Sequence, residues 1–396
     1  MSHHSRRSFL TVAGASLLST AGLGVSSEVG TAQSSGDEFT VVEESPTTKT
    51  LFSAVTSSEG PVAVGAGGDV VARGANGWSK IVEYGPQARS RPLRGAAVTD
   101  DGNGVWFVGG SGVIGEYRVD TDTLTNYSAP KGKTSTWEDV AVVGHAGTDE
   151  RLYFVNGSGE LLVGVRQESG AIRYEEVLKP GGGSTIPGID FHGRKAGHVA
   201  STSQLVAATS DGGMEWNRIG IDFAGGAFYD LASVAADDVN VAGGDGIVYR
   251  YDGSRWTPHV IDGDRQAIRG IDRDGGDGLA VGTDGKIYER QSAGEWTRFQ
   301  TATDAQFNGV ASGPNFDVAV GNTGAIAERT VDGDDGDDGI LPILGGSATD
   351  SLVTTTLDST TTDSILDGDF EPEFPVAYDP DAVVEVVEGK WVLGES

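Results

Sequence analysis

Seven short turns, most of them rich in glycine, recur along the chain at intervals of 39 to 47 residues. Each turn lies between two short strands in which Val and Ala predominate. The turns span residues 65–68, 109–112, 156–159, 201–204, 243–246, 282–285 and 321–324. A repeat of about forty residues, built from short strands and tight turns, is typical of the blades of a β-propeller. The sequence therefore predicts an all-β fold, a seven-bladed β-propeller of four-stranded antiparallel blades.

The seventh repeat lacks a fourth strand of its own, because acidic sequence begins directly after Ile326–Thr330. A suitable strand precedes the first repeat. Glu38–Glu43 alternates apolar and polar residues in the same way as the outer strand Trp78–Glu83. We predict that this N-terminal strand pairs with the strand around Ile326, closes the ring and covers an edge that would otherwise attract other strands. The alternative is that Val383–Val387 supplies the missing strand.

The two ends of the chain differ from the predicted propeller domain, which spans residues 37–330. Ser5-Arg6-Arg7-Ser8-Phe9-Leu10, followed by an apolar stretch to Val25, resembles a twin-arginine signal peptide over residues 1–32. This resemblance implies export to the cell surface or beyond, with membrane contact only if the signal stays uncleaved. Residues 331–396 hold 17 acidic residues and one Lys. Such a composition predicts an acidic tail that is mostly disordered.

The formal net charge of −30 narrows the range of partners. An acidic surface repels phosphates, so we do not expect nucleic-acid binding. The excess of 20 Arg over 8 Lys, together with the many Asp residues, resembles secreted proteins of salt-loving archaea. The absence of Cys excludes disulfides and thiol chemistry. We expect a monomer without a cofactor.

One hairpin carries a recognisable motif, [ST]-x-D-x-G-x-x-W, in Thr209, Asp211, Gly213 and Trp216. The Asp carboxylate is expected to accept backbone N–H groups of the turn, while the Trp ring packs between sheets. Over residues 50–330 the chain resembles the Asp-box (BNR-type) propellers and the photosystem II assembly-factor propellers, although only this box is complete. The resemblance implies that the box is structural and that Asp211 is not catalytic. It also implies a protein partner.

The residues around the start of the first strand of each repeat are predicted to project at the top of the central channel, where propellers usually bind their ligands. The predicted binding patch comprises Arg94, Trp137, Glu138, Phe228, Tyr229, Asp230, Arg269, Phe307 and Asn308. Aromatic, Arg and Asn side chains suit recognition. The alternative for Trp137, Phe228 and Phe307 is packing between blades.

No catalytic or metal-binding residue is predicted. His192 and His198 are expected to flank a turn instead of sharing a face, and Asp272–Asp277 lacks the spacing of a calcium loop. The sequence thus favours a secreted, salt-adapted, non-catalytic binding or assembly scaffold for a protein partner. The alternative is a sialidase-like or other glycan-active hydrolase on the top face, which would need an Arg cluster, a Tyr nucleophile and an acid. Its ligand would be an extracellular glycan.

Overall fold

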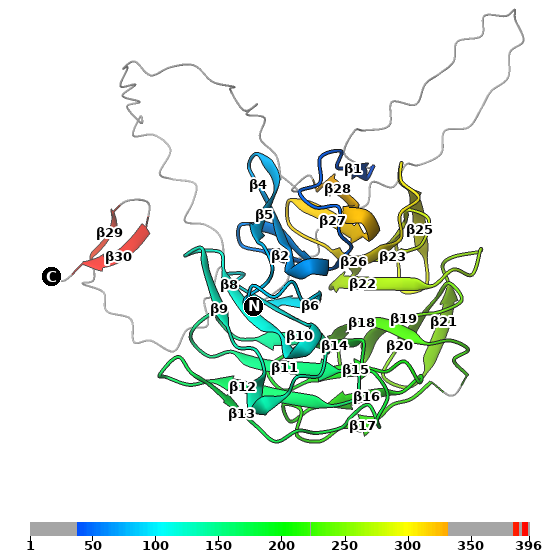
Figure 1. Cartoon of the computed structure of the whole chain (residues 1–396), viewed down its shortest axis with the longest axis horizontal. Helices are drawn as coiled ribbons and strands as arrows, with labels where there is room; N and C mark the ends of the chain where they lie inside the picture. Colours follow the sequence, from blue (N-terminus) through cyan, green and yellow to red (C-terminus); the bar gives the residue numbers. More distant parts are fainter. Residues whose placement is uncertain (1–37, 222, 332–382, 388–389, 395–396) are drawn as a thin grey trace, which may run out of the picture. The chain divides into compact units, whose positions relative to one another are not determined.

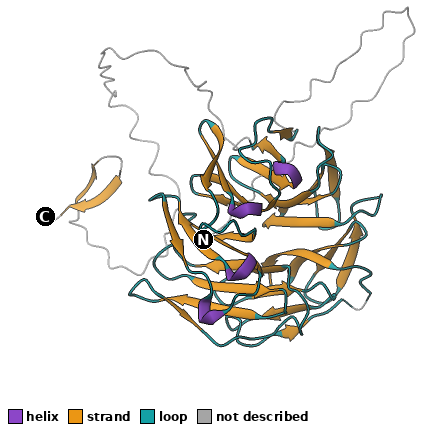
Figure 2. Ribbon diagram, viewed as in Figure 1, coloured by secondary structure: helices purple, strands orange, loops and turns teal. Residues whose placement is uncertain are grey.

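The computed structural model describes residues 38–221, 223–331, 383–387 and 390–394. Residues 38–331 fold into seven four-stranded antiparallel sheets arranged as the blades of a ring. The first strand of each sheet faces the common centre (Figure 1). Helical structure in the described residues is limited to single 3-10 turns (Figure 2), which are η1 (Ala66–Gly68), η2 (Gly110–Gly112), η3 (Pro130–Gly132) and η4 (Asn322–Gly324). The predicted seven-bladed β-propeller is confirmed.

The strands of each blade follow one another from the centre outward. The first three blades are β2 (Leu51–Ser57), β3 (Gly60–Gly65), β4 (Val70–Gly74) and β5 (Gly77–Val82); β6 (Leu93–Val98), β7 (Gly104–Gly109), β8 (Ile114–Arg118) and β9 (Thr123–Asn126); and β10 (Trp137–Val143), β11 (Arg151–Asn156), β12 (Leu161–Arg166) and β13 (Ile172–Tyr174). The next three are β14 (Gly188–Phe191), β15 (Gly197–Ala200), β16 (Val206–Thr209) and β17 (Asn217–Arg218); β18 (Phe228–Ala235), β19 (Asp238–Gly243), β20 (Ile247–Tyr251) and β21 (Trp256–Val260); and β22 (Ile268–Asp274), β23 (Asp277–Gly282), β24 (Lys286–Arg290) and β25 (Trp296–Gln300).

The seventh blade takes strands from two distant parts of the chain. It combines β26 (Phe307–Ala311), β27 (Phe316–Gly321) and β28 (Ile326–Thr330) with the N-terminal β1 (Thr40–Val41). Thr40 pairs with Glu328 and Val41 with Ala327. The ring is therefore closed by the N-terminal strand, as predicted.

Val383–Val387, the alternative closing strand, forms β29 instead and pairs with β30 (Lys390–Gly394) in a separate hairpin. The predicted signal peptide and most of the predicted acidic tail lie outside the described residues. Among the described residues, no helix is long and apolar enough to cross a membrane.

Each gap between neighbouring blades holds its own apolar core. Seven clusters of buried side chains are present in the described residues, one for each blade-to-blade interface. Phe39, directly before β1, belongs to the cluster between the sixth and seventh blades. Because each blade contributes side chains to two interfaces, the ring buries both faces of every sheet.

The turns between second and third strands bind the chain just before the first strand of the same blade. Ala66 N–H donates to Thr50 O at 2.8 Å, Gly110 N–H to Pro92 O at 2.9 Å, and Asn322 N–H to Gln306 O at 2.9 Å. These turns and the starts of the first strands therefore share one end of the channel, which we call the mouth. The hairpins between third and fourth strands lie at the opposite end.

The motif hairpin between β16 and β17 has the local geometry that its residues predict. Asp211 Oδ1 accepts hydrogen bonds from Thr209 Oγ1 at 2.9 Å and from the backbone N–H of Met214 at 2.9 Å. Trp216 Nε1 donates to Gly213 O at 3.0 Å. Its backbone hydrogen bonds, above all that from the Glu215 N–H, hold the pKa of Asp211 below its usual range. Every contact of this carboxylate thus stabilises its own turn.

Candidate functional site

A cavity of about 550 Å³ occupies the centre of the ring and is lined by the first strands of all seven blades. Its mouth is built by one recurring device. In six blades the pairing of the first two strands slips by one residue at the start of the first strand, which is a β-bulge. The bulge residues are Phe52, Arg94, Glu138, Tyr229, Arg269 and Asn308, and all six line the cavity.

The bulge explains why neighbouring residues have opposite surroundings. The residue before it is a large apolar side chain that is completely buried in the core in each of the six blades; these residues are Leu51, Leu93, Trp137, Phe228, Ile268 and Phe307. The residue after it is Ser, Gly or Asp, and the glycines lie where neighbouring inner strands approach closely. A Cβ on Gly309 would lie 2.7 Å from Ser53 Cα of the next blade. Pro187 lines the cavity in the fourth blade, between buried Ile186 and Gly188.

The structure divides the predicted binding patch into three groups. Arg94, Glu138, Tyr229, Arg269 and Asn308 line the cavity at its mouth. The rings of Trp137, Phe228 and Phe307 are 0% exposed, which corrects their predicted placement at the mouth. Their backbone positions are at the mouth, but the bulge turns each ring into the core, as in the alternative of packing between blades.

Phe52 and Pro187 line the mouth but are absent from the predicted patch. The sequence does carry a signal for them. Every blade has a large apolar residue, one variable residue and then Ser, Gly or Asp at or directly before the start of its first strand, as in Leu51-Phe52-Ser53 and Ile186-Pro187-Gly188. The variable residue of this triplet faces the cavity.

The cations of the mouth stack on aromatic rings. Arg269 Cζ lies 4.2 Å from the centre of the Tyr229 ring, and Arg94 Cζ lies 5.4 Å from that of Phe52. Arg94 Nε also lies 3.5 Å from Glu138 Oε2. Among the described residues of the propeller, Arg269 forms no ion pair. Its buried Nε also has no hydrogen-bond partner among them. Its charge is therefore available to a ligand at the mouth.

Asp230, the remaining member of the predicted patch, lies inside the cavity and bridges two blades. Its Oδ1 accepts the Leu231 N–H at 2.8 Å, and its Oδ2 accepts the Ile271 N–H of the sixth blade at 2.9 Å. Three further Asp residues form the same kind of bridge. Asp139 accepts the Ile189 N–H at 3.0 Å, Asp190 the Ser233 N–H at 2.7 Å, and Asp272 the Ser312 N–H at 2.7 Å. This carboxylate chain links the third to the seventh blade.

The cavity raises the pKa of all four carboxyl groups. Burial is the main cause, and repulsion between neighbouring carboxylates adds to it, while the backbone N–H donors act in the opposite direction. The pKa rises to about 6 for Asp190 and to about 7 for Asp230. The cavity therefore has a basic and aromatic mouth above an acidic interior, in which burial raises the pKa of every one of these carboxyl groups.

We predict that thermal stability falls as the pH rises from 6.5 to 8.5, because folded Asp230 holds its proton well above the pKa of an unfolded Asp (about 3.9). The raised folded pKa makes ionisation destabilising, so stability falls as the pH rises from about 4 to about 7, and the last part of that loss lies within this window. Buried histidines act in the opposite sense only below about 6.5, where the unfolded imidazole takes up its proton. Melting curves of the wild type and Asp230→Asn test this, and the variant is expected to show a weaker decline. Exposed Asp284→Asn serves as the control, and an equal decline in all three proteins would contradict the assignment.

The expectation that His192 and His198 do not share a face is wrong. Their rings stack with centres 5.5 Å apart, and both Nδ1 atoms lie on Ser233 Oγ, at 2.8 Å and 2.6 Å. At least one of the two imidazoles must donate to this oxygen through Nδ1–H, because the hydroxyl has only one proton to give. Burial lowers the pKa of His198 to about 4 and also lowers that of His192. The residues that the structure describes hold no group of three or more His, Asp or Glu side chains arranged to bind a metal ion.

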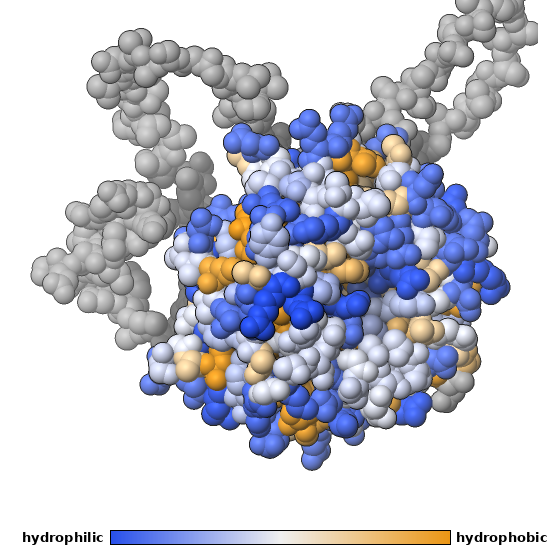
Figure 3. Space-filling model, in the orientation of Figure 1, coloured by the Kyte–Doolittle hydropathy of each residue, from blue (hydrophilic) through white to orange (hydrophobic). Residues whose placement is uncertain are grey.

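The described outer surface carries few exposed large hydrophobic side chains. On the side shown in Figure 3, hydrophilic side chains predominate and hydrophobic ones form small separate groups. The large hydrophobic side chains that are exposed in the described residues are Tyr84, Leu124, Met214, Phe223 and Val260. The mouth is thus a part of the described surface where several aromatic and cationic groups converge on one cavity.

The fold places the chain in the class of seven-bladed β-propellers, with a cavity at the centre of the ring. No protein-family model matches the sequence, and no curated protein matches it either. Solved structures resemble it in fold. YCF48 bound to D1 peptide superposes with a TM-score of 0.59 at 11% identity, covering 75% of this chain and 96% of that one.

Two other similar structures come from different kinds of protein. Virginiamycin B lyase from Staphylococcus aureus has a TM-score of 0.59 at 15% identity and covers 74% of this chain and 100% of its own. A chain of the mitotic checkpoint complex has a TM-score of 0.60 at 13% identity, with 81% and 99% covered. Since an enzyme and parts of protein complexes share this fold, the likeness establishes the fold alone.

Proposed function

We propose that the protein is an exported, salt-adapted scaffold that binds a protein partner at the channel mouth and catalyses no reaction. The observation that carries this proposal is the set of bulge residues. Six blades each contribute one side chain to the mouth, and two of these side chains are Arg residues stacked on aromatic rings. Arg and aromatic side chains dominate the binding energy of protein interfaces. The peptide bound by the similar propeller YCF48 supports a protein partner.

The interior carboxylates argue for binding over glycan hydrolysis. Each of the four Asp side chains accepts a backbone N–H of the next blade, so their oxygens hold the ring together. A sialidase-like site would instead need a Tyr hydroxyl activated by a carboxylate. In the described residues, the Tyr229 hydroxyl makes no hydrogen bond, while its ring lies under Arg269.

The sequence-based features that support export and salt adaptation are the Ser5–Leu10 motif and the net charge of −30.

Removing both mouth cations is expected to lower partner recovery from a native extract at least tenfold, because each Arg is of the kind that contributes about 1 to 2 kcal/mol at an interface. The variant is Arg94→Ala with Arg269→Ala. The matched control is Arg255→Ala with Arg298→Ala, which removes two cations that are 78% and 50% exposed away from the mouth. Unchanged recovery by the mouth variant would contradict the proposed surface. Turnover of any compound in a glycan panel would contradict the non-catalytic proposal.

A further inference from the structure

The third strands of the blades carry a repeated ion pair close to the end of the ring opposite the mouth. Glu328 lies seven residues after Gly321, the first residue of its turn, and Arg73 lies eight residues after Gly65. Arg73 Nε donates to Glu328 Oε2 at 2.9 Å across the interface of the seventh and first blades. The sixth and seventh blades repeat this arrangement, where Arg329 Nη2 donates to Glu289 Oε1 at 2.9 Å.

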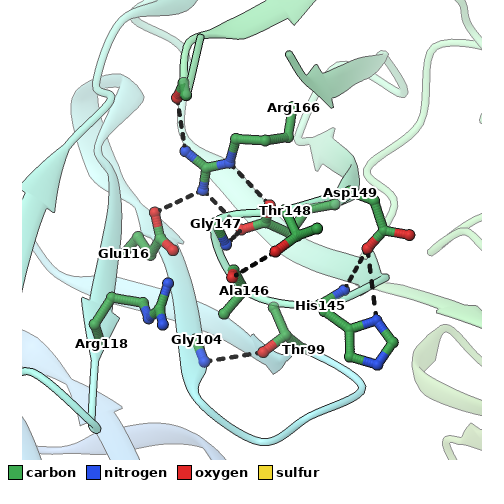
Figure 4. Close-up of polar contacts among 12 residues, drawn as sticks. Thr99, Gly104, Glu116, Arg118, His145, Ala146, Gly147, Thr148, Asp149 and Arg166 are labelled. Atoms are coloured by element: carbon green, nitrogen blue, oxygen red, sulfur yellow. Dashed lines mark hydrogen bonds and ion pairs between the residues drawn. The ribbon is translucent and has the colours of Figure 1, made fainter. Parts of the chain in front are cut away.

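A third interface has a Glu at the same position. Glu116 lies seven residues after Gly109 and accepts Arg166 Nη2 of the third blade at 2.9 Å. Figure 4 shows this carboxylate pointing toward the guanidinium. A Glu of one blade facing an Arg of the next is therefore a recurring means of balancing charge between the sheets.

The interface of the fifth and sixth blades breaks this pattern. Arg250 lies seven residues after Gly243, where the other three blades have Glu, and Arg290 lies eight residues after Gly282. Arg therefore faces Arg at this interface. Arg273 adds a third guanidinium, whose side chain is 0% exposed. Burial together with the charges of Arg273 and Arg250 lowers the pKa of Arg290 to about 10.

The nearby carboxylates do not balance these three cations. Asp238 is held by Arg273 through Nη1 at 2.9 Å and Nη2 at 3.0 Å, and Arg250 Nε lies 3.4 Å from the same Asp238 Oδ1. Asp277 acts on Arg290 from a longer range, and Arg290 Nη1 donates to the backbone carbonyl of Gly276. The cluster thus concentrates positive charge in a chain whose net charge is −30.

Unpartnered donors gather at this cluster. Within the described residues, nine buried side-chain nitrogen or oxygen atoms lack a hydrogen-bond partner, and four of them belong here. They are the Nε atoms of Arg250, Arg273 and Arg290 and the Nδ2 atom of Asn240, a side chain that is 0% exposed. Buried donors without partners are costly, and a bound acceptor would remove that cost.

We propose that Arg250, Arg273, Arg290 and Asn240 form an anion site that takes a tetrahedral oxyanion such as phosphate or sulfate. Guanidinium groups present paired N–H donors that match the oxygens of such an anion. The Arg250 side chain is 24% exposed, which leaves the cluster open to solvent on that side. The site lies at the other end of the first strand from the mouth, since Arg273 follows Arg269 by four residues in β22. It is therefore a second site, independent of the partner surface.

Inorganic phosphate and sulfate are the probes for this site. The melting temperature of the wild type is expected to rise with phosphate in a saturable manner, by roughly 5 °C at a hundred times the dissociation constant. Arg250→Glu is expected to remove this response. It should also raise the melting temperature without the anion, because it recreates the Glu–Arg pair of the neighbouring interfaces. Exposed Arg255→Glu, in the same blade, should keep the response.

Sodium chloride at matched ionic strength separates binding from screening. An equal shift with chloride, or an unchanged phosphate response in Arg250→Glu, would overturn the proposal. Should Arg250→Glu not fold, Arg250→Gln gives the same comparison, with loss of the phosphate response expected. Isothermal titration calorimetry with sulfate should show one site in the wild type, and heat of equal size in the variant would likewise overturn the proposal.

Discussion

Replacing Arg166 by Met is expected to lower the free energy of unfolding by about 3 to 5 kcal/mol. This guanidinium bridges two blades. Its Nη2 contacts Glu116 Oε2 at 2.9 Å and Glu150 Oε1 at 2.7 Å, and the three side chains are 4%, 4% and 0% exposed. Its Nε donates to Glu150 Oε2 at 2.8 Å, and its Nη1 donates to the Tyr127 hydroxyl and to the backbone carbonyl of Gly170, both at 2.9 Å. Met preserves much of the side-chain volume but leaves two buried carboxylates without their cation.

Urea denaturation of Arg166→Met, with and without Glu116→Gln, measures this effect. The second substitution removes one of the two stranded charges, so part of the lost stability should return. A loss below 1 kcal/mol for Arg166→Met would show that the ion-pair network does not hold the second and third blades together.

Replacing Phe39 by Ala is expected to cost about 3 to 5 kcal/mol, a loss of the size seen when a large aromatic ring leaves a core. Phe39 is 8% exposed and packs edge-on against Phe299 of the sixth blade, with ring centres 5.9 Å apart. Arg329 Cζ lies 4.6 Å from its ring centre. The residue thus fixes the closing strand β1, and its loss also frees the edge of β28 for pairing with other chains.

The matched control for closure is Glu38→Ala, since Glu38 is the exposed neighbour of Phe39. Chemical denaturation should leave the control within about 0.5 kcal/mol of the wild type. Light scattering of Phe39→Ala should show self-association that the control lacks. Equal stability of the two variants would mean that the N-terminal strand contributes little to ring closure.

The fold was predictable from the sequence because its determinants are local and repeated. The turns from Gly65 to Gly321 mark every blade, and the alternation in Glu38–Glu43 identifies the closing strand before any long-range contact is known. The strand alternation fails at the mouth for a physical reason. A β-bulge inserts one residue, so Trp137 turns into the core while its neighbour Glu138 turns into the cavity.

Contacts between blades were less predictable, because they join residues about forty positions apart. The Asp230 carboxylate reaches the Ile271 N–H of the next blade, 41 residues along the chain. Its position in the sequence, at the start of a first strand, does not distinguish Asp230 from a residue exposed at the mouth. The proximity of Arg250 to Arg290 is also hidden until the strands are aligned by their turns, because each Arg alone resembles the many solvent-exposed ones in this chain.

Site-specific photocrosslinking tests the proposed function most directly. A photoreactive phenylalanine derivative at Tyr229 lies in the mouth, whereas the same group at Met214, a side chain that is 61% exposed, lies on a hairpin at the opposite end of the ring. Irradiation in a native extract is expected to join the partner to position 229 and not to position 214, with the product lost when Arg94 and Arg269 are both Ala. A partner captured only from position 214 would contradict the account.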